Sequence, residues 1–351
     1  MKYTTLSIFT VLFMVSCGAS GVVFLGDVVK TVDRPKQVDT LSGSPVILEG
    51  EYTGMMFAYD GMLLFESHLH RGGWLYLYDV ETGKRIHAMC RIGQGPNEYM
   101  SVHFSGFERY SGETYFWILD AVRNRVKLVN KRCEAIRDID VSSFRSVNSM
   151  GGVGMVHILN DSLLFTYVRS VQISHNKFSA PSYHIFNYKL GETVKIFTLY
   201  SDYEVSTNTN LWLPEFYLSS PPGAVKPDRS KIALMRTHLR RLDFIDLVSG
   251  KLTSVKMRDS PDLNLISSGG YIHFYFRGIQ SDERYIFVVE VLDRRFLGIN
   301  VFDWEGNFVR ILRFYENKDE SIFAFDPVRK ILYSKDLSER IIAYDLNFLY
   351  E

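Results

Sequence analysis

The chain has 351 residues and a formal net charge of zero, with 40 Lys and Arg residues against 40 Asp and Glu residues. This balance, without a long basic run, excludes nucleic-acid binding and electrostatic attachment to a membrane surface as expected functions. Hydrophobic residues make up 46% of the chain and aromatic residues 14%, which is enough to bury packed β-sheets. Length alone suggests two domains, so the internal repeats must decide the domain count.

The first residues have the pattern of an export signal. Lys2 gives a basic start, and an apolar stretch from Leu6 to Val15 follows, too short to span a bilayer as a mature helix. The pair Ser16-Cys17 resembles the end of a bacterial lipobox, in which a small residue precedes the cysteine that receives lipid. The alternative is an ordinary signal peptide with an incidental cysteine. We expect a signal peptide over residues 1–16 and lipidation at Cys17.

These features predict a place in the bacterial cell envelope. We expect a lipid anchor in the outer membrane, with no other contact between the protein and the membrane. No acidic cluster follows Cys17, so a periplasmic and a surface-exposed position both stay open. Residues 17–44 would form a tether that includes a possible closing strand, and residues 45–351 would form the folded domain.

A strand-turn-strand unit recurs through the folded domain, and its best copy spans residues 74–86. In each copy an apolar run ends at Asp or Asn, turn residues follow, and a second run begins. A Gly such as Gly83 tolerates the positive φ that a tight turn requires, so the unit predicts a β-hairpin. The copies recur at intervals of roughly 40 to 60 residues, which is typical of propeller blades. They align at Asp79, Asn130, Asn187, Asp246, Asp303 and Asp345.

Further strand pairs precede most copies, as at residues 55–65 and 322–333, where a turn of Asp-Gly or Asp-Pro type separates two apolar runs. They supply the two inner strands of each blade. The last copy ends near the C-terminus, so residues 45–49 are the best candidate to pair with it and protect both free edges. The fold class we predict is all-β: a monomeric six-bladed β-propeller of four-stranded antiparallel blades, closed by an N-terminal strand.

The segment 91–99 is a glycine-rich loop whose residues suit a sharp turn of the chain. Gly93 and Gly95 allow a sharp change of direction, and Pro96 stiffens it. Glu98 can accept hydrogen bonds from backbone amides, and Tyr99 can bury its ring between blades. We expect a structural role for these residues.

The same segment resembles the G-x-G-P-x-E-[FY] loop of six-bladed propellers related to NHL repeats, above all the TolB-like propeller lipoproteins of Bacteroidetes. The resemblance implies that the loop leads from the outermost strand of one blade to the innermost strand of the next. Later blades of this chain lack the motif.

Two cysteines follow Cys17, namely Cys90 and Cys133. An exported chain could join them by a disulfide. Because outer strands of neighbouring blades usually diverge, two separate buried thiols are favoured, and both possibilities stay open. Neither cysteine has the spacing of a metal cluster.

Candidate ligand-binding residues follow the second strand of several blades, where a propeller opens its central channel. Arginines on such a ring would favour a carboxylate or phosphate ligand. The alternative is that they are solvated loop ends that satisfy neighbouring carbonyls. Two of the histidines alternate along a strand and could share a metal, although Glu66 is the only carboxylate near them. The candidates are His68, His70, Arg71, Arg169, Arg236, His238, His273 and Arg277.

The expected function is binding without catalysis, with no catalytic residues, no cofactor and no metal. The chain lacks a nucleophile elbow and a zinc-binding His-Glu-x-x-His motif. The partner would be an envelope protein, a peptide or a glycan. The alternative is a metal-dependent hydrolase or lyase at the central channel, using a divalent metal such as Ca²⁺. Scattered residues that could hold such a metal are Glu51, Asn148, Asn160, Asp228 and Asp282.

Overall fold

A computed structural model describes most of the folded part of the chain. The described residues are 22–50, 52–67, 72–95, 98–144, 155–168, 172–174, 176–204, 218, 223–264, 273–292, 295–315, 322–336 and 338–351. The structure is all-β, and the described residues also include two short 3-10 helices, Ser142–Phe144 (η1) and Asn347–Leu349 (η2). None of the described residues belongs to a helix long and apolar enough to cross a membrane. The expected signal peptide and Cys17 lie outside the described residues.

The first three sheets each have four antiparallel strands, and they follow one another along the chain. Sheet 1 consists of β4 (Met55–Tyr59), β5 (Met62–Glu66), β6 (Leu75–Asp79) and β7 (Arg85–Met89). Sheet 2 consists of β8 (His103–Tyr110), β9 (Glu113–Asp120), β10 (Arg125–Val129) and β11 (Ala135–Asp140). Sheet 3 consists of β12 (Val156–Ile158), β13 (Leu163–Val168), β16 (Ser182–Asn187) and β17 (Glu192–Thr198).

The next three sheets use the later part of the chain, and each of them also takes one strand from the N-terminal part, so that sheets 4 and 5 have five strands each and not the expected four. Sheet 4 contains β19 (Gly223–Val225), β20 (Lys231–Arg236), β21 (Arg241–Asp246) and β22 (Leu252–Met257). Sheet 5 contains β23 (Phe276–Ser281), β24 (Tyr285–Leu292), β25 (Arg295–Asp303) and β26 (Phe308–Phe314). Sheet 6 contains β27 (Ile322–Asp326), β28 (Ile331–Lys335), β29 (Ile341–Asp345) and β3 (Ser44–Val46).

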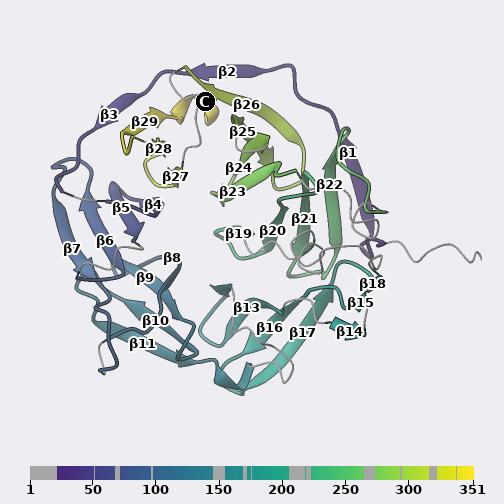
Figure 1. Cartoon of the computed structure of the whole chain (residues 1–351), viewed down its shortest axis with the longest axis horizontal. Helices are drawn as coiled ribbons and strands as arrows, with labels where there is room; N and C mark the ends of the chain where they lie inside the picture. Colours follow the sequence, from purple (N-terminus) through teal and green to yellow (C-terminus); the bar gives the residue numbers. More distant parts are fainter. Residues whose placement is uncertain are drawn as a thin grey trace, which may run out of the picture.

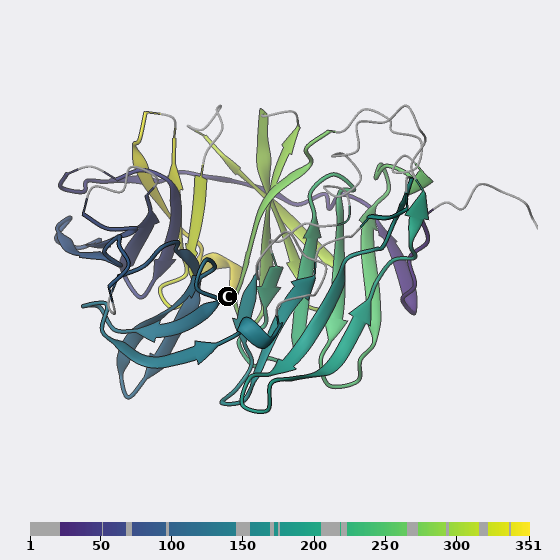
Figure 2. The ribbon, with the colours of Figure 1, turned by 60° about the horizontal axis from the view of Figure 1, so that its bottom comes forward.

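Residues 28–46, which we call the N-terminal strap, lie along the outer edges of sheets 4 to 6. Strand β1 (Val28–Val32) pairs in parallel with β22, and β2 (Val38–Leu41) pairs in parallel with β26. Strand β3 pairs antiparallel with β29, with Pro45 opposite Ile342. Figures 1 and 2 show the strap, in purple, running along the outside of these sheets. The expected pairing of an N-terminal strand with the last repeat is therefore present, and part of the expected tether forms two further strands.

Sheets 1 to 6 are arranged around a central opening, with β4, β8, β19, β23 and β27 on the inner side (Figure 1). In the described part of the chain, the buried hydrophobic residues form six clusters, and each cluster joins two neighbouring sheets. One of these clusters joins the last sheet to the first, since it contains Tyr333 of sheet 6 and Phe65 of sheet 1. Burial is thus continuous from sheet to sheet around the opening.

The inner and outer strands of a sheet differ in burial, because the second strand is covered on both faces. In β5 the residues from Met62 to Phe65 are all buried, whereas β7 exposes the first three of its five residues. A strand that is covered on both faces has a continuous run of apolar residues, and the sequence shows such a run from Met62 to Phe65.

The predicted hairpins form at the predicted turns. Asp79 ends β6 and accepts a hydrogen bond from the Thr82 amide at 2.8 Å, and Asp246 does the same for Ser249 at 2.8 Å. Gly83, with φ of 69°, supplies the left-handed conformation that such a turn requires. These Asp and Gly residues therefore serve the turns.

The structure departs from six uniform sheets in one further respect. A seventh sheet, of three strands, lies beside the others: β14 (Gln172–Ser174), β15 (Lys177–Phe178) and β18 (Tyr203–Glu204). It arises because the connection between β13 and β16 is long enough to fold into a hairpin, which then pairs with the segment after β17. Such short pairings leave too weak a periodicity to be predicted from sequence.

Candidate functional site

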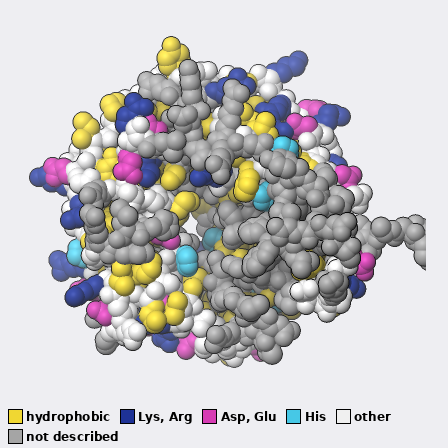
Figure 3. All heavy atoms as spheres, viewed as in Figure 1, with side chains coloured by type: hydrophobic (Ala, Val, Ile, Leu, Met, Phe, Trp, Pro, Cys, Tyr) yellow, Lys and Arg dark blue, Asp and Glu magenta, His cyan; other side chains and the backbone are white. Residues whose placement is uncertain are grey.

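The expected ligand site lies at one end of the sheets, which we call the connection face. Strands of an antiparallel sheet alternate in direction, so the connections between second and third strands emerge on the same side as the links to the next sheet. Figure 3 shows a hollow at the centre of the ring, with histidine side chains beside it. Of the predicted ligand residues, His68, His70, Arg71 and Arg169 lie outside the described residues.

Arg236 ends β20, and its side chain is fully buried. Its Nε lies 2.6 Å from an Asp243 carboxylate oxygen, and its Nη1 donates to the Tyr183 hydroxyl at 2.7 Å and to the Leu218 carbonyl. The guanidinium therefore joins sheets 3 and 4 and is not presented to a ligand in solution.

Asp243 is the centre of this buried group, which we call the arginine joint. Besides Arg236, it accepts hydrogen bonds from Tyr200 at 2.7 Å and Ser254 at 2.6 Å, and Arg241 lies 3.3 Å away. Burial disfavours the charged carboxylate, but the two guanidiniums outweigh burial and lower the pKa of Asp243. The joint is thus a buried structural ion network, in which the Nη2 atoms of Arg236 and Arg241 have no hydrogen-bond partner among the described residues.

The other described candidates come together where sheet 4 meets sheet 5. The Nδ1 atom of His238 lies 3.0 Å from the His273 carbonyl oxygen, and burial lowers the pKa of His238. Phe274 is 54% exposed and contacts the His238 ring edge-on, at 4.5 Å between centroids. Arg277, at the start of the inner strand β23, is exposed. This corner has an exposed aromatic ring and a partly exposed histidine, His273, and the exposed Arg277 follows four residues later in the chain.

One further histidine near this face, at the start of an inner strand, was not predicted from the sequence. His103 begins β8, and its Nδ1 lies 3.6 Å from the carboxylate of Glu66 at the end of β5. Hydrogen bonding to Glu66 raises the pKa of His103. The available signal was its place at the start of an inner strand, directly after the glycine-rich loop.

An ion network behind this face includes the N-terminal strap. Arg240, with φ of 48°, contacts both Glu290 and Asp259, and Arg34 of the strap lies 2.6 Å from Glu290. Burial raises the pKa of Glu290, although Arg240 opposes this shift. Arg240 also lies over the Tyr275 ring at 5.6 Å. The network holds the strap against sheets 4 and 5.

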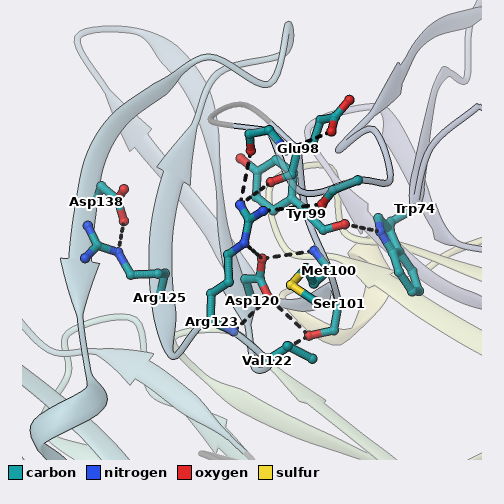
Figure 4. Close-up of polar contacts among 12 residues, drawn as sticks. Trp74, Glu98, Tyr99, Met100, Ser101, Asp120, Val122, Arg123, Arg125 and Asp138 are labelled. Atoms are coloured by element: carbon teal, nitrogen blue, oxygen red, sulfur yellow. Dashed lines mark hydrogen bonds and ion pairs between the residues drawn. The ribbon is translucent and has the colours of Figure 1, made fainter.

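The glycine-rich loop forms a clasp between sheets 1 and 2 (Figure 4). Arg123 donates hydrogen bonds to the carbonyls of Glu98 at 2.7 Å, Gly95 at 3.3 Å and Gly93 at 3.4 Å. Asp120 is buried and accepts hydrogen bonds from the backbone amides of Met100 and Arg123, each at 3.2 Å. We call this group the loop joint.

The loop residues make the contacts expected of them. The Glu98 carboxylate accepts a hydrogen bond from the Gly95 amide at 2.8 Å, and Tyr99 is buried with residues of both sheets. A Cβ atom on Gly93 would lie 2.0 Å from the Glu98 carboxylate, so a larger residue there would displace the Glu98 side chain. Trp74 donates to the Tyr99 carbonyl at 3.2 Å. Pro96 lies outside the described residues.

The scattered residues considered as metal ligands serve turns. Asn160 accepts the Leu163 amide at 2.9 Å, Asp228 accepts the Ser230 amide at 2.9 Å, and Asp282 accepts the Tyr285 amide at 2.7 Å. All three lie between the first and second strands of their sheets, at the end away from the connection face. Among the described residues, no three His, Cys, Asp or Glu side chains are grouped to hold a metal. Glu51 and Asn148 lie outside the described residues.

Comparisons with known proteins support the fold. The chain is similar to a Bacteroides fragilis protein described as exported, with 12% identity and a TM-score of 0.55 over 90% of this chain and 98% of that one. It is similar to a DUF4221 family member from Bacteroides vulgatus, with 12% identity and a TM-score of 0.56 over 93% and 98%. No protein-family model and no curated protein matches the chain. Identity this low shows a shared fold alone.

Proposed function

We propose that this chain is an exported, lipid-anchored six-bladed β-propeller that binds an envelope partner and does not catalyse a reaction. The cluster that joins sheets 6 and 1, and the pairing of β3 with β29, support a closed ring of six blades. The description of the Bacteroides fragilis neighbour as exported supports the envelope location. The pattern ending at Cys17 supports the lipid anchor.

One observation carries the choice of binding over catalysis. Asn160, Asp228 and Asp282, which could have held a catalytic metal, bond to backbone amides in turns on the far side from the connection face. A metal centre in a propeller needs such groups to converge on the channel. The polar residues at the starts of inner strands at the connection face, such as His103 and Arg277, can donate hydrogen bonds or carry positive charge.

These donors indicate the chemistry of the partner. An exposed arginine recognises carboxylate groups through paired hydrogen bonds, and an exposed aromatic ring such as Phe274 adds apolar or sugar-stacking surface. The partner is therefore an acidic segment of an envelope protein, peptide or glycan, bound at the corner of His238, His273, Phe274 and Arg277.

Binding of defined polymers tests this proposal. We expect polygalacturonate or poly-glutamate to bind in a titration, and neutral dextran not to bind. Arg277→Ala should weaken binding at least tenfold, whereas Arg132→Ala, an exposed arginine in the β10–β11 turn, should leave it unchanged. Equal binding by both variants would contradict the site. A thermal stabilisation by Ca²⁺ together with ester or lactone hydrolysis would favour the metal-dependent enzyme instead.

Fractionation of cells tests the anchor independently. Cys17→Ser should move the protein from the membrane fraction to the soluble fraction, because the acyl chains would be lost. An unchanged distribution would contradict lipidation.

A further inference from the structure

Cys90 and Cys133 come from different sheets and meet side by side. Cys90 follows β7 of sheet 1, and Cys133 lies in the turn between β10 and β11 of sheet 2. Their sulfur atoms are 3.1 Å apart, and both residues are free thiols in this structure. The Cys90 amide also donates a hydrogen bond to the Cys133 sulfur, at 3.1 Å. The two thiols are therefore unbonded, as favoured from the sequence, but the neighbouring sheets bring them into contact, and Cys133 is only partly buried.

Cys133 occupies a turn position that other sheets give to glycine. The turn of sheet 5 is the direct counterpart, since Gly306 donates to Asp303 as Cys133 donates to Asn130. Cys133 has φ of 64° and Gly306 has φ of 76°, so both are left-handed. This conformation is strained for a residue with a Cβ atom, and such strain often marks a functional position.

The glycine turns also show what the Cys133 side chain does. In sheet 5, a Cβ atom on Gly306 would lie 2.4 Å from Val255 of the preceding sheet. In sheet 4, a Cβ atom on Gly250 would lie 2.5 Å from Lys195 of the preceding sheet. In both turns a side chain on the glycine would face the preceding sheet. In sheet 2, Cys133 faces the preceding sheet in the same way, and its sulfur lies against the sulfur of Cys90.

The two thiols have different environments. Cys133 is partly exposed, and its thiol donates to the Tyr99 hydroxyl oxygen at 3.7 Å. A hydrogen bond from the Cys90 thiol, supported by Tyr99, the Cys90 amide and Lys127, lowers the pKa of Cys133 to about 7 despite its partial burial. Cys90 is buried, and burial raises its pKa well above the usual range. Cys133 is therefore the thiol that ionises first and that a reagent can reach.

We propose that Cys133 is an attacking thiol and Cys90 a resolving thiol, and that they form a disulfide between sheets 1 and 2 when the protein meets a disulfide oxidant. The arrangement fits an exported protein, since its compartment supplies such oxidants. A sulfur–sulfur bond of about 2.05 Å requires the two atoms to approach by only about 1 Å.

The chemistry balances with a disulfide as the electron acceptor. The Cys133 thiolate attacks one sulfur of the oxidant, forming a mixed disulfide and expelling one thiolate, which takes up a proton. The Cys90 thiol then gives up its proton, and its sulfur attacks the Cys133 sulfur and expels the second thiolate. The protein loses two electrons and two protons, and the oxidant becomes two thiols.

The test uses the full chain with Cys17→Ser, which leaves two of the three cysteines. When the protein is unfolded in guanidinium chloride before labelling, reduced protein should take up two N-ethylmaleimide groups, and protein first treated with oxidised glutathione should take up none. A non-reducing peptide map should show the peptides of Cys90 and Cys133 joined. The oxidised form should unfold at a higher temperature than the reduced form, and dithiothreitol should abolish the difference.

Single substitutions distinguish the roles of the two thiols. Cys90→Ser should accumulate a glutathione adduct on Cys133, because no resolving thiol remains. Cys133→Gly keeps the turn conformation. In this variant, oxidised glutathione should modify Cys90 at least tenfold more slowly than it modifies Cys133 in Cys90→Ser. Two maleimide groups after oxidation, or equally fast modification of Cys90 in Cys133→Gly, would overturn the proposal. Cys133→Gly should unfold no earlier than the reduced parent, so a loss of fold cannot imitate the result.

Discussion

The arginine joint and the loop joint connect neighbouring sheets by different physical means. In the arginine joint, the Arg236 and Asp243 side chains are both 0% exposed, so two charges are held entirely away from water. In the loop joint, Arg123 is 23% exposed and donates hydrogen bonds to backbone carbonyls of a loop, while Asp120 is 0% exposed. Losing one partner therefore has unequal consequences, because a buried charge without its partner is far costlier than a lost carbonyl contact.

The two joints differ in how strongly their polar groups stabilise the ring. At the arginine joint, the charges on two consecutive strands reach tyrosines of the neighbouring sheet. At the loop joint, a single arginine orders a link that would otherwise be held mainly by Tyr99 and Trp74. The first joint should govern global stability, and the second should govern the order of the link.

Asp243→Asn is the change with the largest expected effect. It leaves the Arg236 and Arg241 guanidiniums without a carboxylate in a buried site, so we expect the free energy of unfolding to fall by about 3–5 kcal/mol. Urea unfolding followed by circular dichroism measures it. Asp246→Asn, three residues further along in an exposed turn, is the control and should cost less than about 0.5 kcal/mol. A loss below about 1 kcal/mol for Asp243→Asn would contradict the comparison.

Sheet 3 contains a histidine, His157, that should make the stability of the protein sensitive to acid. The Nε2 atom of His157 on β12 is buried and has no hydrogen-bond partner among the described residues, and burial lowers the pKa of His157 from 6.5 to about 4. The unfolded chain therefore binds a proton near pH 6.5, and the folded protein only near pH 4. Stability conferred by neutral His157 is complete above pH 6.5 and is lost as the pH falls to 4, by up to about 3 kcal/mol.

Unfolding of the parent and of His157→Phe between pH 7 and pH 4 checks this expectation. The variant should lose less stability over this range, and equal losses would contradict it. His184 and His238, whose pKa values burial lowers, and His103, whose pKa is raised, stay in both proteins and cancel in the comparison. The lowered pKa of Asp243 adds a separate loss only below pH 3.8.

Arg123→Met tests the loop joint. It removes the charged donor to the carbonyls of Gly93, Gly95 and Glu98 but keeps the aliphatic part of the side chain, so we expect a loss of about 2 kcal/mol. Hydrogen exchange of the amides in the loop should accelerate more than exchange in the core strands. Uniform acceleration throughout the protein would show that the joint acts globally, against our interpretation.

Trp74→Phe has the smallest expected effect. It removes the hydrogen bond of 3.2 Å to the Tyr99 carbonyl and keeps an aromatic ring, so a loss of about 1 kcal/mol is expected. The same unfolding experiment measures it, and Tyr115→Phe, whose hydroxyl contacts Glu113 near the surface, is the matched control with almost no expected change. A larger loss than that of Arg123→Met would reverse the order proposed for this joint.

Much of the fold could be predicted, because each hairpin carries its own local signal. Asp79 and Asp246 end third strands, as predicted, since a turn requires an acceptor and a left-handed residue within a few positions. The N-terminal strand opposite Ile342 could be predicted from the unpaired last repeat. Strands β1 and β2 could not, because they are short and four of the five β1 residues are exposed.

The contacts of the candidate site residues could be predicted less well from the sequence than the strands. Arg236 and His238 were grouped by position in the repeat, yet Arg236 turns into the arginine joint. Which side chains meet across two sheets depends on the twist and offset of those sheets, and no single hairpin encodes this. The meeting of Cys90 with Cys133 has the same cause, since residues of different repeats approach only once the sheets are packed.

The N-terminal strap has a consequence for the order in which the protein is made. Its strands leave the ribosome first, but β22, β26 and β29, against which they pair, are synthesised last. Until residue 345 has emerged, the strap has no complete set of partners, and the outer edges of sheets 4 and 5 stay open to wrong pairing. The ring can therefore be completed only once β29 has been synthesised, although its first strands are made more than 280 residues earlier.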